Sequence, residues 1–143
     1  QEIQNNKVNF HKFIEIIRNF KPDLILTHSN HDKHRDHKVV FELTNEAVWK
    51  AKENIMPELG DQHNTSELWS FEILDPFSAP DIIVDISDVF ENKIKAIDLH
   101  KSQLPILDNI KDYLKGISLV RGYQTGIKHG EAFKVLNSCP RVF

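Results

Sequence analysis

The fold is decided by the stretch Asp23-Leu24-Ile25-Leu26-Thr27-His28-Ser29-Asn30-His31-Asp32-Lys33-His34-Arg35-Asp36-His37. Its first five residues form a short, largely apolar run after the breaker Lys21-Pro22, which predicts a buried strand of the parallel type. The sequence then becomes abruptly polar and leads into a helical pattern. Because ligands of open α/β sheets bind beyond the carboxyl ends of the strands, this polar segment is a candidate site.

Amphipathic helices are predicted on both sides of this strand. The upstream helix covers about residues 6–20, and its apolar stripe consists of Phe10, Phe13, Ile14, Ile17 and Phe20. The downstream helix carries the same spacing at Val40, Leu43, Ala47 and Ala51. A helix, a tight turn and a buried strand make half of a βαβ unit, so the order of elements predicts an α/β fold.

The remaining sequence continues this alternation. Residues 53–67 are predicted to be a polar surface loop, and strands are predicted over residues 68–74, 82–84 and 131–136. A helix is predicted from a capping box of Asp88 and Glu91 to about Ser102, and a weaker helical pattern covers residues 107–120. We expect all 143 residues to belong to one domain.

Composition excludes several classes of partner. The formal net charge of -3 gives no basic excess, so we expect no nucleic-acid partner. The absence of any apolar run of about 18 residues predicts no membrane span. The single cysteine, Cys139, cannot form an internal disulfide, which favours a reducing compartment and a cytoplasmic location. A homo-oligomer is left open.

Four histidines, His28, His31, His34 and His37, fall within the polar segment. Imidazole and carboxylate groups are the ligands of catalytic zinc, which usually takes three protein groups and leaves one position for water. His34 and His37 are three residues apart and close enough to face one cavity, and Asp36 is available to fix the tautomer of a ring. The alternative is a solvated polar loop that happens to be rich in histidine.

Two known motifs compete for this segment. The metallo-β-lactamase motif H-x-H-x-D-H matches residues 32–37 in all but its first ligand. That family also needs small residues after the motif, whereas Lys38-Val39-Val40 follows here, and the helix before the strand does not suit a β-sandwich.

The sequence resembles the PIG-L/LmbE family of zinc-dependent N-deacetylases more closely. Residues 22–28 and 32–37 are similar to the family's P-D-(apolar)3-T-H and D-x-H-P-D-H signature, with Arg35 in place of the usual proline. Two later blocks follow in order. They are Val84-Asp85-Ile86-Ser87 with Lys93, Ala96 and His100-Lys101-Ser102-Gln103, and Arg121-Gly122 with Gly126 and Glu131-Ala132-Phe133.

The resemblance implies a Rossmann-like three-layer fold with a mainly parallel sheet whose N-terminal strands are missing. The family's A-H-P-D-D-E signature, which supplies two zinc ligands and the general base, does not occur in this sequence. The chain also opens with Gln1 and no initiator Met. We therefore expect the C-terminal part of a deacetylase domain, inactive alone because one protein ligand cannot hold catalytic zinc.

The resemblance also implies roles for individual residues. His37 is the expected zinc ligand, and His34 is the histidine that stabilises the tetrahedral intermediate or protonates the departing amine, with Asp36 orienting it. The other expected substrate-binding residues are His28, Asp32, His100 and Arg121. Water activated by zinc would attack the acetyl carbonyl of an N-acetylglucosamine-type conjugate. A non-catalytic carbohydrate-binding derivative of a deacetylase is the remaining alternative.

Overall fold

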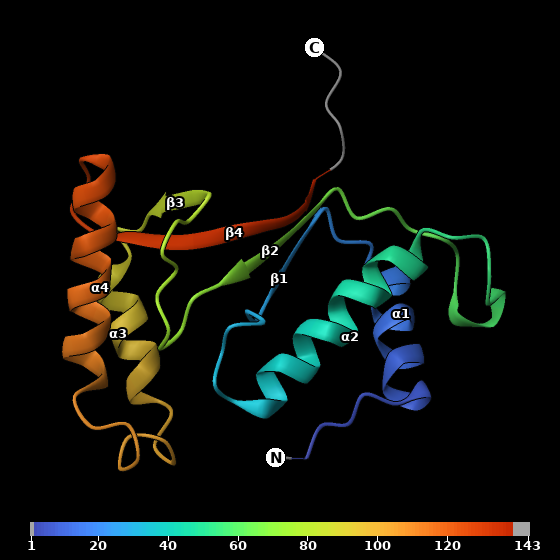
Figure 1. Ribbon diagram of the computed structural model, residues 1–143, viewed down its shortest axis with the longest axis horizontal. Coiled ribbons are helices and arrows are strands. Elements are labelled where there is room, and N and C mark those ends of the chain that lie inside the picture. The colour runs from blue at the N-terminus through green and yellow to red at the C-terminus, as the bar shows by residue number, and fades with distance from the viewer. Residues whose placement is uncertain (1, 139–143) are drawn as a thin grey trace. The chain divides into compact units, whose positions relative to one another are not determined.

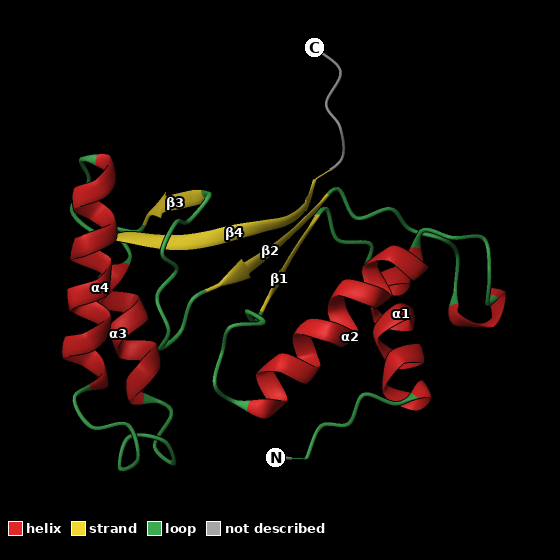
Figure 2. Ribbon diagram, viewed as in Figure 1, coloured by secondary structure: helices red, strands yellow, loops and turns green. Residues whose placement is uncertain are grey.

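The computed structural model describes residues 2–138, so Cys139 lies outside the described residues. Helices and strands follow one another in the order that the sequence predicts, with a short 3-10 helix added (Figures 1 and 2). In chain order the elements are α1 (Lys7–Phe20), β1 (Leu24–Thr27), α2 (Arg35–Ala51), the 3-10 helix η1 (Pro57–Leu59), β2 (Glu67–Phe71), β3 (Ile82–Asp85), α3 (Phe90–Asp98), α4 (Ile110–Thr125) and β4 (Gly130–Ser138).

The first helix is bounded by local signals at both ends. The side chain of Asn6 accepts a hydrogen bond from the backbone N–H of Asn9 at 2.9 Å and so caps the amino end. Lys21 ends the helix in the left-handed region, at φ 53°, and Pro22 follows. These caps fix where α1 stops and β1 begins.

One core holds the two amino-terminal helices against the sheet. Of the apolar stripe predicted for α1, Phe10, Phe13, Ile14 and Ile17 pack in one cluster with α2 and β2, whereas Phe20 is exposed. The buried members of this cluster are Ile14, Ile17, Ala47, Val48, Ala51 and Leu68. Removing this apolar surface from water is the main stabilising term, at roughly 25 cal/mol per Å².

Strand pairing confirms the α/β class, with one departure from a parallel sheet. β1 pairs with β2 in parallel, with Leu24 opposite Glu67 and Thr27 opposite Ser70. β2 pairs with β4 in antiparallel orientation, from Glu67 opposite Ser138 to Phe71 opposite Phe133. Among the described residues, β1 has no partner on its other side.

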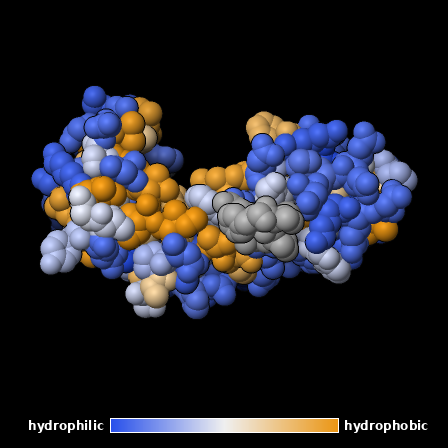
Figure 3. Space-filling model, turned by 90° about the horizontal axis from the view of Figure 1, so that it is seen from above, coloured by the Kyte–Doolittle hydropathy of each residue, from blue (hydrophilic) through white to orange (hydrophobic). Residues whose placement is uncertain are grey.

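The chain divides into two compact units. The first comprises residues 1–77 and 133–143, of which residues 2–77 and 133–138 are described, and the second comprises Ser78–Ala132. The second unit contains β3, α3, α4 and the start of β4, and apolar side chains are visible on its surface at the left of Figure 3. The expectation of a single domain stays a prediction.

The second unit corrects one prediction in detail. The N-cap of α3 is Val89, with no side-chain hydrogen bond, so the predicted capping box of Asp88 and Glu91 is wrong. The carboxylate of Asp85 instead accepts hydrogen bonds from both the N–H and the hydroxyl of Ser87, at 2.9 and 2.6 Å. These bonds lower the pKa of the Asp85 carboxyl. Within residues 2–138, no helix is long and apolar enough to cross a membrane.

Candidate metal centre

The polar loop at the carboxyl end of β1 is held in a tight turn. Thr27, the last residue of β1, is buried, and its hydroxyl donates to the hydroxyl of Thr44 in α2 at 3.3 Å. The hydroxyl of Ser29 accepts the backbone N–H of His31 at 3.1 Å, and its carbonyl accepts the N–H of Asp32 at 3.3 Å. These bonds turn the chain back towards the start of α2.

This turn brings three of the four histidines together. The rings of His28 and His37 stack with centroids 4.0 Å apart and planes 4° apart. The ring of His34 lies 4.6 Å from that of His37. Phe71, at the end of β2, packs its edge against His28 at 5.0 Å. The predicted convergence of His34 and His37 is therefore present, and His28 joins them.

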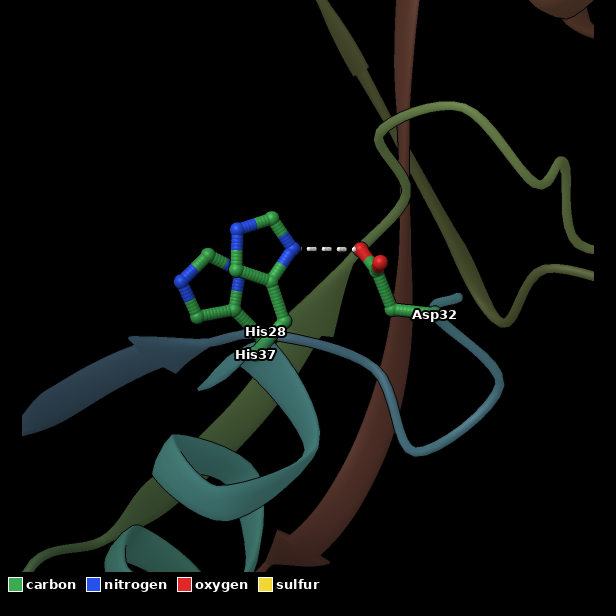
Figure 4. Close-up of side chains that lie close together, drawn as sticks. All are labelled: His28, Asp32 and His37. Atoms are coloured by element: carbon green, nitrogen blue, oxygen red, sulfur yellow. Dashed lines mark hydrogen bonds and ion pairs between the residues drawn. The ribbon is translucent and has the colours of Figure 1, made fainter. Parts of the chain in front are cut away.

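Asp32 is the acidic member of the cluster. Its Oδ2 lies 2.9 Å from Nδ1 of His37 (Figure 4). Its Oδ1 accepts the backbone N–H of His34 at 2.8 Å. Burial raises the pKa of the Asp32 carboxyl, but the hydrogen bonds from His34 and His37 outweigh it and leave this pKa below its ordinary value. Asp32 is therefore an ionised acceptor at neutral pH.

The cluster has the chemistry of a metal site. One ligand atom from each of His28, Asp32 and His37 lies within 4.8 Å of the others. Nδ1 of His28 is buried and has no hydrogen-bond partner in the described part of the chain, which is costly unless a ligand satisfies it. Burial first, and then the nearby His37, lower the pKa of His28, so its ring is neutral and keeps a lone pair. These residues fit a zinc ion.

His34 occupies the N-cap of α2. Its Nδ1 accepts the backbone N–H of Asp36 at 3.2 Å, which satisfies one of the open donors of the helix. Since Nδ1 accepts, the neutral ring carries its proton on Nε2. The side chain of this residue is exposed, so Nε2–H is available to a ligand.

The carboxylate of Asp36 contacts the amino-terminal segment. It accepts the backbone N–H of Glu2 at 3.3 Å. Burial raises the pKa of the Asp36 carboxyl, but the hydrogen bond from the backbone of Glu2, together with one from Ile3 and the nearby His34, contributes to a pKa below its ordinary value. Asp36 was expected to fix the tautomer of a histidine ring. For His37, Asp32 holds the ring nitrogen Nδ1 instead. The catalytic role of Asp36 stays a prediction.

His100 and Arg121 belong to the second unit. His100 is exposed just after α3. Arg121 is 4% exposed in α4 and donates to the side chain of Gln124 at 3.1 Å. Glu131, which shares a sequence block with Arg121, pairs with Lys93 at 2.7 Å. Substrate binding by His100 and Arg121 stays a prediction.

Sequence reasoning missed one residue of the cluster. Phe71 reaches His28 because β1 and β2 are parallel, with Thr27 opposite Ser70, so that the next residue along each chain, His28 and Phe71, are neighbours. The signal was the position of Phe71 near the carboxyl end of a second predicted strand. The metallo-β-lactamase alternative requires a mostly β fold, and the helices and mixed sheet of residues 2–138 do not provide one.

Comparison with known proteins identifies similar sequences. A family model described as PIG-L, GlcNAc-PI de-N-acetylase, matches residues 3–48, which include α1, β1 and the histidine loop. Diacetylchitobiose deacetylase of Thermococcus kodakarensis is 30% identical over 149 aligned residues, which cover 90% of this chain and 52% of that protein. The chain thus spans about half the length of this curated relative. The resemblance to the PIG-L family is confirmed.

Solved structures share the fold. A conserved protein of Thermus thermophilus has a TM-score of 0.88 and 22% identity, covering 99% of this chain and 64% of its own. N,N'-diacetylchitobiose deacetylase of Pyrococcus horikoshii has a TM-score of 0.77 and 24% identity, and the match covers 94% of this chain and 53% of that protein. The 4-carboxy-2-hydroxymuconate hydratase GalB of Pseudomonas putida has a TM-score of 0.80 and 20% identity, and the match covers 99% of this chain and 62% of that protein. At these identities the likeness shows the fold alone, and the same fold serves a deacetylase and a hydratase.

Proposed function

Because the chain is related to the PIG-L family, we propose that it is the later part of a single zinc-dependent N-deacetylase domain. The matching relatives include deacetylases of diacetylchitobiose. The proposed substrate is accordingly an N-acetylated amino sugar of the N-acetylglucosamine type. The proposed products are acetate and the free amine. A cytoplasmic location is proposed because the chain has a single cysteine, which cannot form an internal disulfide.

The observation that carries the proposal is the pair of stacked imidazoles beyond the carboxyl end of β1. His37 would hold the ion, and His28, with its unsatisfied Nδ1, lies beside it as a second imidazole. When bound, zinc supplies Lewis acidity, which polarises a carbonyl group and lowers the pKa of water. The neutral ring of His28 is the form that suits ligation.

His34 is proposed to act on the substrate directly. Its Nε2–H is an outward-facing donor, because its Nδ1 is occupied by the backbone N–H of Asp36. Such a donor stabilises negative charge as it develops on the acetyl carbonyl oxygen. Asp36 is proposed to orient that ring, because its backbone N–H holds Nδ1 of His34.

The remaining metal ligands are proposed to come from a polypeptide segment outside this sequence. The sequence contains no A-H-P-D-D-E signature, and a catalytic zinc usually takes three protein ligands. The general base and further ligands would come from a segment outside these 143 residues. The isolated chain would then bind zinc weakly and release no acetate.

Acetate release from diacetylchitobiose tests the proposal. It is measured with the 143-residue chain and with a longer polypeptide that adds a segment bearing the A-H-P-D-D-E signature. We expect no release from the chain and zinc-dependent release from the longer polypeptide. His37→Asn should abolish that release. His31→Asn is the matched control, because His31 is an exposed histidine of the same loop.

Two outcomes contradict the proposal. Acetate release by the 143-residue chain alone would show that no outside ligand is needed. A longer polypeptide that binds the sugar but neither holds zinc nor releases acetate would be a non-catalytic carbohydrate-binding derivative.

A further inference from the structure

The carboxylate of Asp32 uses both of its oxygens within the histidine loop. Oδ1 accepts the backbone N–H of His34 at 2.8 Å, and Oδ2 lies 2.9 Å from Nδ1 of His37. An ionised carboxylate can only accept hydrogen bonds, so the ring of His37 must carry a proton on Nδ1. The pair is mostly screened from water, because the side chain of Asp32 is 13% exposed and that of His37 is 29% exposed.

This bond determines what the other nitrogen of His37 can do. The two nitrogens of an imidazole ring point in widely different directions, and a neutral ring with its proton on Nδ1 has a lone pair on Nε2. Figure 4 shows the second nitrogen of His37 on the side of the ring away from Asp32. The nitrogen free to ligate therefore faces away from the carboxylate.

We propose that Asp32 is a positioning residue of the metal centre: it holds His37 by Nδ1, presents Nε2 to the ion, and is not itself a ligand. This rests on the proposed function in that it takes His37 as the metal-binding residue. The proximity of Asp32 to the two rings also allows three ligands around one ion. However, Nδ1 of His37 cannot donate its proton to Asp32 and give a lone pair to that ion at once.

The second bond of Asp32 extends its effect to His34. The acceptance of the His34 N–H by Oδ1 fixes the backbone immediately before α2, and His34 is the N-cap of that helix. One carboxylate thus sets the ring of His37 and the entry of the chain into α2. Carboxylates that orient a metal-bound imidazole commonly change metal affinity by about 10- to 100-fold.

Nitrogen NMR of the metal-free 143-residue chain tests this assignment directly. Long-range proton–nitrogen spectra report which nitrogen of each imidazole is protonated, and His37→Asn identifies the signals of His37. We expect His37 of the wild type to be protonated on Nδ1. In Asp32→Ala this preference should disappear, whereas Asp32→Asn should keep part of it, because the amide oxygen still accepts a hydrogen bond.

Zinc affinity, measured by competition with a chelating dye, supplies the second readout. Asp32→Ala should weaken binding by about 10- to 100-fold, and Asp32→Asn should weaken it less. The matched control is Asp61→Ala, an exposed carboxylate outside the loop, which should change neither measurement. Backbone amide spectra of each variant establish that it is folded.

Two results would overturn the assignment. The first is a His37 tautomer that is the same in the wild type and in Asp32→Ala. The second is an equal, complete loss of zinc binding in Asp32→Asn and Asp32→Ala with the metal-free tautomer unchanged, which would make Asp32 a ligand. Because the spectra need neither metal nor substrate, they stand even if the longer polypeptide shows no deacetylation.

Discussion

Arg18 is a buried cation whose hydrogen-bond acceptors are all backbone carbonyls. The side chain is 2% exposed, and its guanidinium donates to six carbonyl oxygens at distances from 2.7 to 3.3 Å. The acceptors are Lys50, Ala51, Glu53, Ile55, Met56 and Gly60. The first two end α2, where carbonyls lack helical partners and the helix dipole is negative. Arg18 thus joins α1 to the end of α2 and to the loop that follows.

Replacing this guanidinium should destabilise the fold strongly. Arg18→Met leaves several buried carbonyls without donors, and we expect a loss of about 3 to 5 kcal/mol in the free energy of unfolding. Urea denaturation measures it. Lys12→Met, at an exposed position of the same helix, is the control and should stay within about 0.5 kcal/mol of the wild type. Equal effects of the two substitutions would contradict this account.

At the candidate site, the sequence predicted which residues meet but not every bond between them. The spacing of His34 and His37, together with the strand before them, was enough to place both rings in one cluster. The choice between Asp32 and Asp36 as the partner of His37 could not be predicted, because it depends on how the loop turns at Ser29. Turn geometry of this kind is set by a few backbone hydrogen bonds that no periodicity reveals.

At the scale of elements, α4 contains two glycines with opposite surroundings. A Cβ on Gly122 would lie 2.5 Å from the carbonyl oxygens of Ile127 and Lys128, which are backbone atoms that cannot move aside cheaply. A Cβ on Gly116 would meet nothing within 4 Å. Gly122 therefore permits the close return of the chain after α4, whereas Gly116 only weakens the helix.

Alanine substitutions should separate these two roles. Gly122→Ala should lower the free energy of unfolding by about 1 to 3 kcal/mol through overpacking. Gly116→Ala, in the same helix, should raise it by about 0.5 to 1 kcal/mol, because alanine has the higher helix propensity. Thermal and urea unfolding of both variants check the signs. A stabilised Gly122→Ala would show that the chain after α4 is not closely packed there.

Elements with strong periodicity or clear breakers were predictable. The stripe of α1 and the Lys21-Pro22 break gave α1 and β1 within a residue or two. The capping box at Asp88 failed because Asp85 and Ser87 form a local turn first, so that α3 starts later, at Phe90. The antiparallel placement of β4 beside β2 was also beyond reach, since strand direction depends on tertiary pairing rather than on local pattern.

At the scale of the whole molecule, β1 borders an exposed apolar groove. The groove is a hollow of about 410 Å³ between α1, α2 and β1. Several of its apolar side chains are strongly exposed, namely Ile16 at 58%, Phe20 at 80%, Leu24 at 40% and Leu26 at 49%. In the part of the chain that the structure describes, β1 has an unpaired edge beside this exposed apolar surface, and such an edge favours association with other chains.

A charge placed in this groove should reduce association. We expect the wild-type chain to bind the dye ANS and to gain apparent mass with concentration in sedimentation experiments, and Leu26→Lys to weaken both. Val8→Lys is the control, because Val8 is 74% exposed on α1 but does not line the groove. Equal ANS binding by Leu26→Lys and Val8→Lys would show that the groove is not the surface through which the chains associate. A homo-oligomer remains a prediction until this is measured.

The division of the chain into two units has a consequence for synthesis. The first unit draws on residues 133–138 of β4, which a ribosome makes only after the whole of Ser78–Ala132. During translation, β2 therefore remains unpaired on one side while Ser78–Ala132, some fifty-five residues, is synthesised. β2 and β4 can pair only after residues 133–138 have been made, so a nascent chain that stalls before them exposes the unpaired side of β2 to chaperones and proteases.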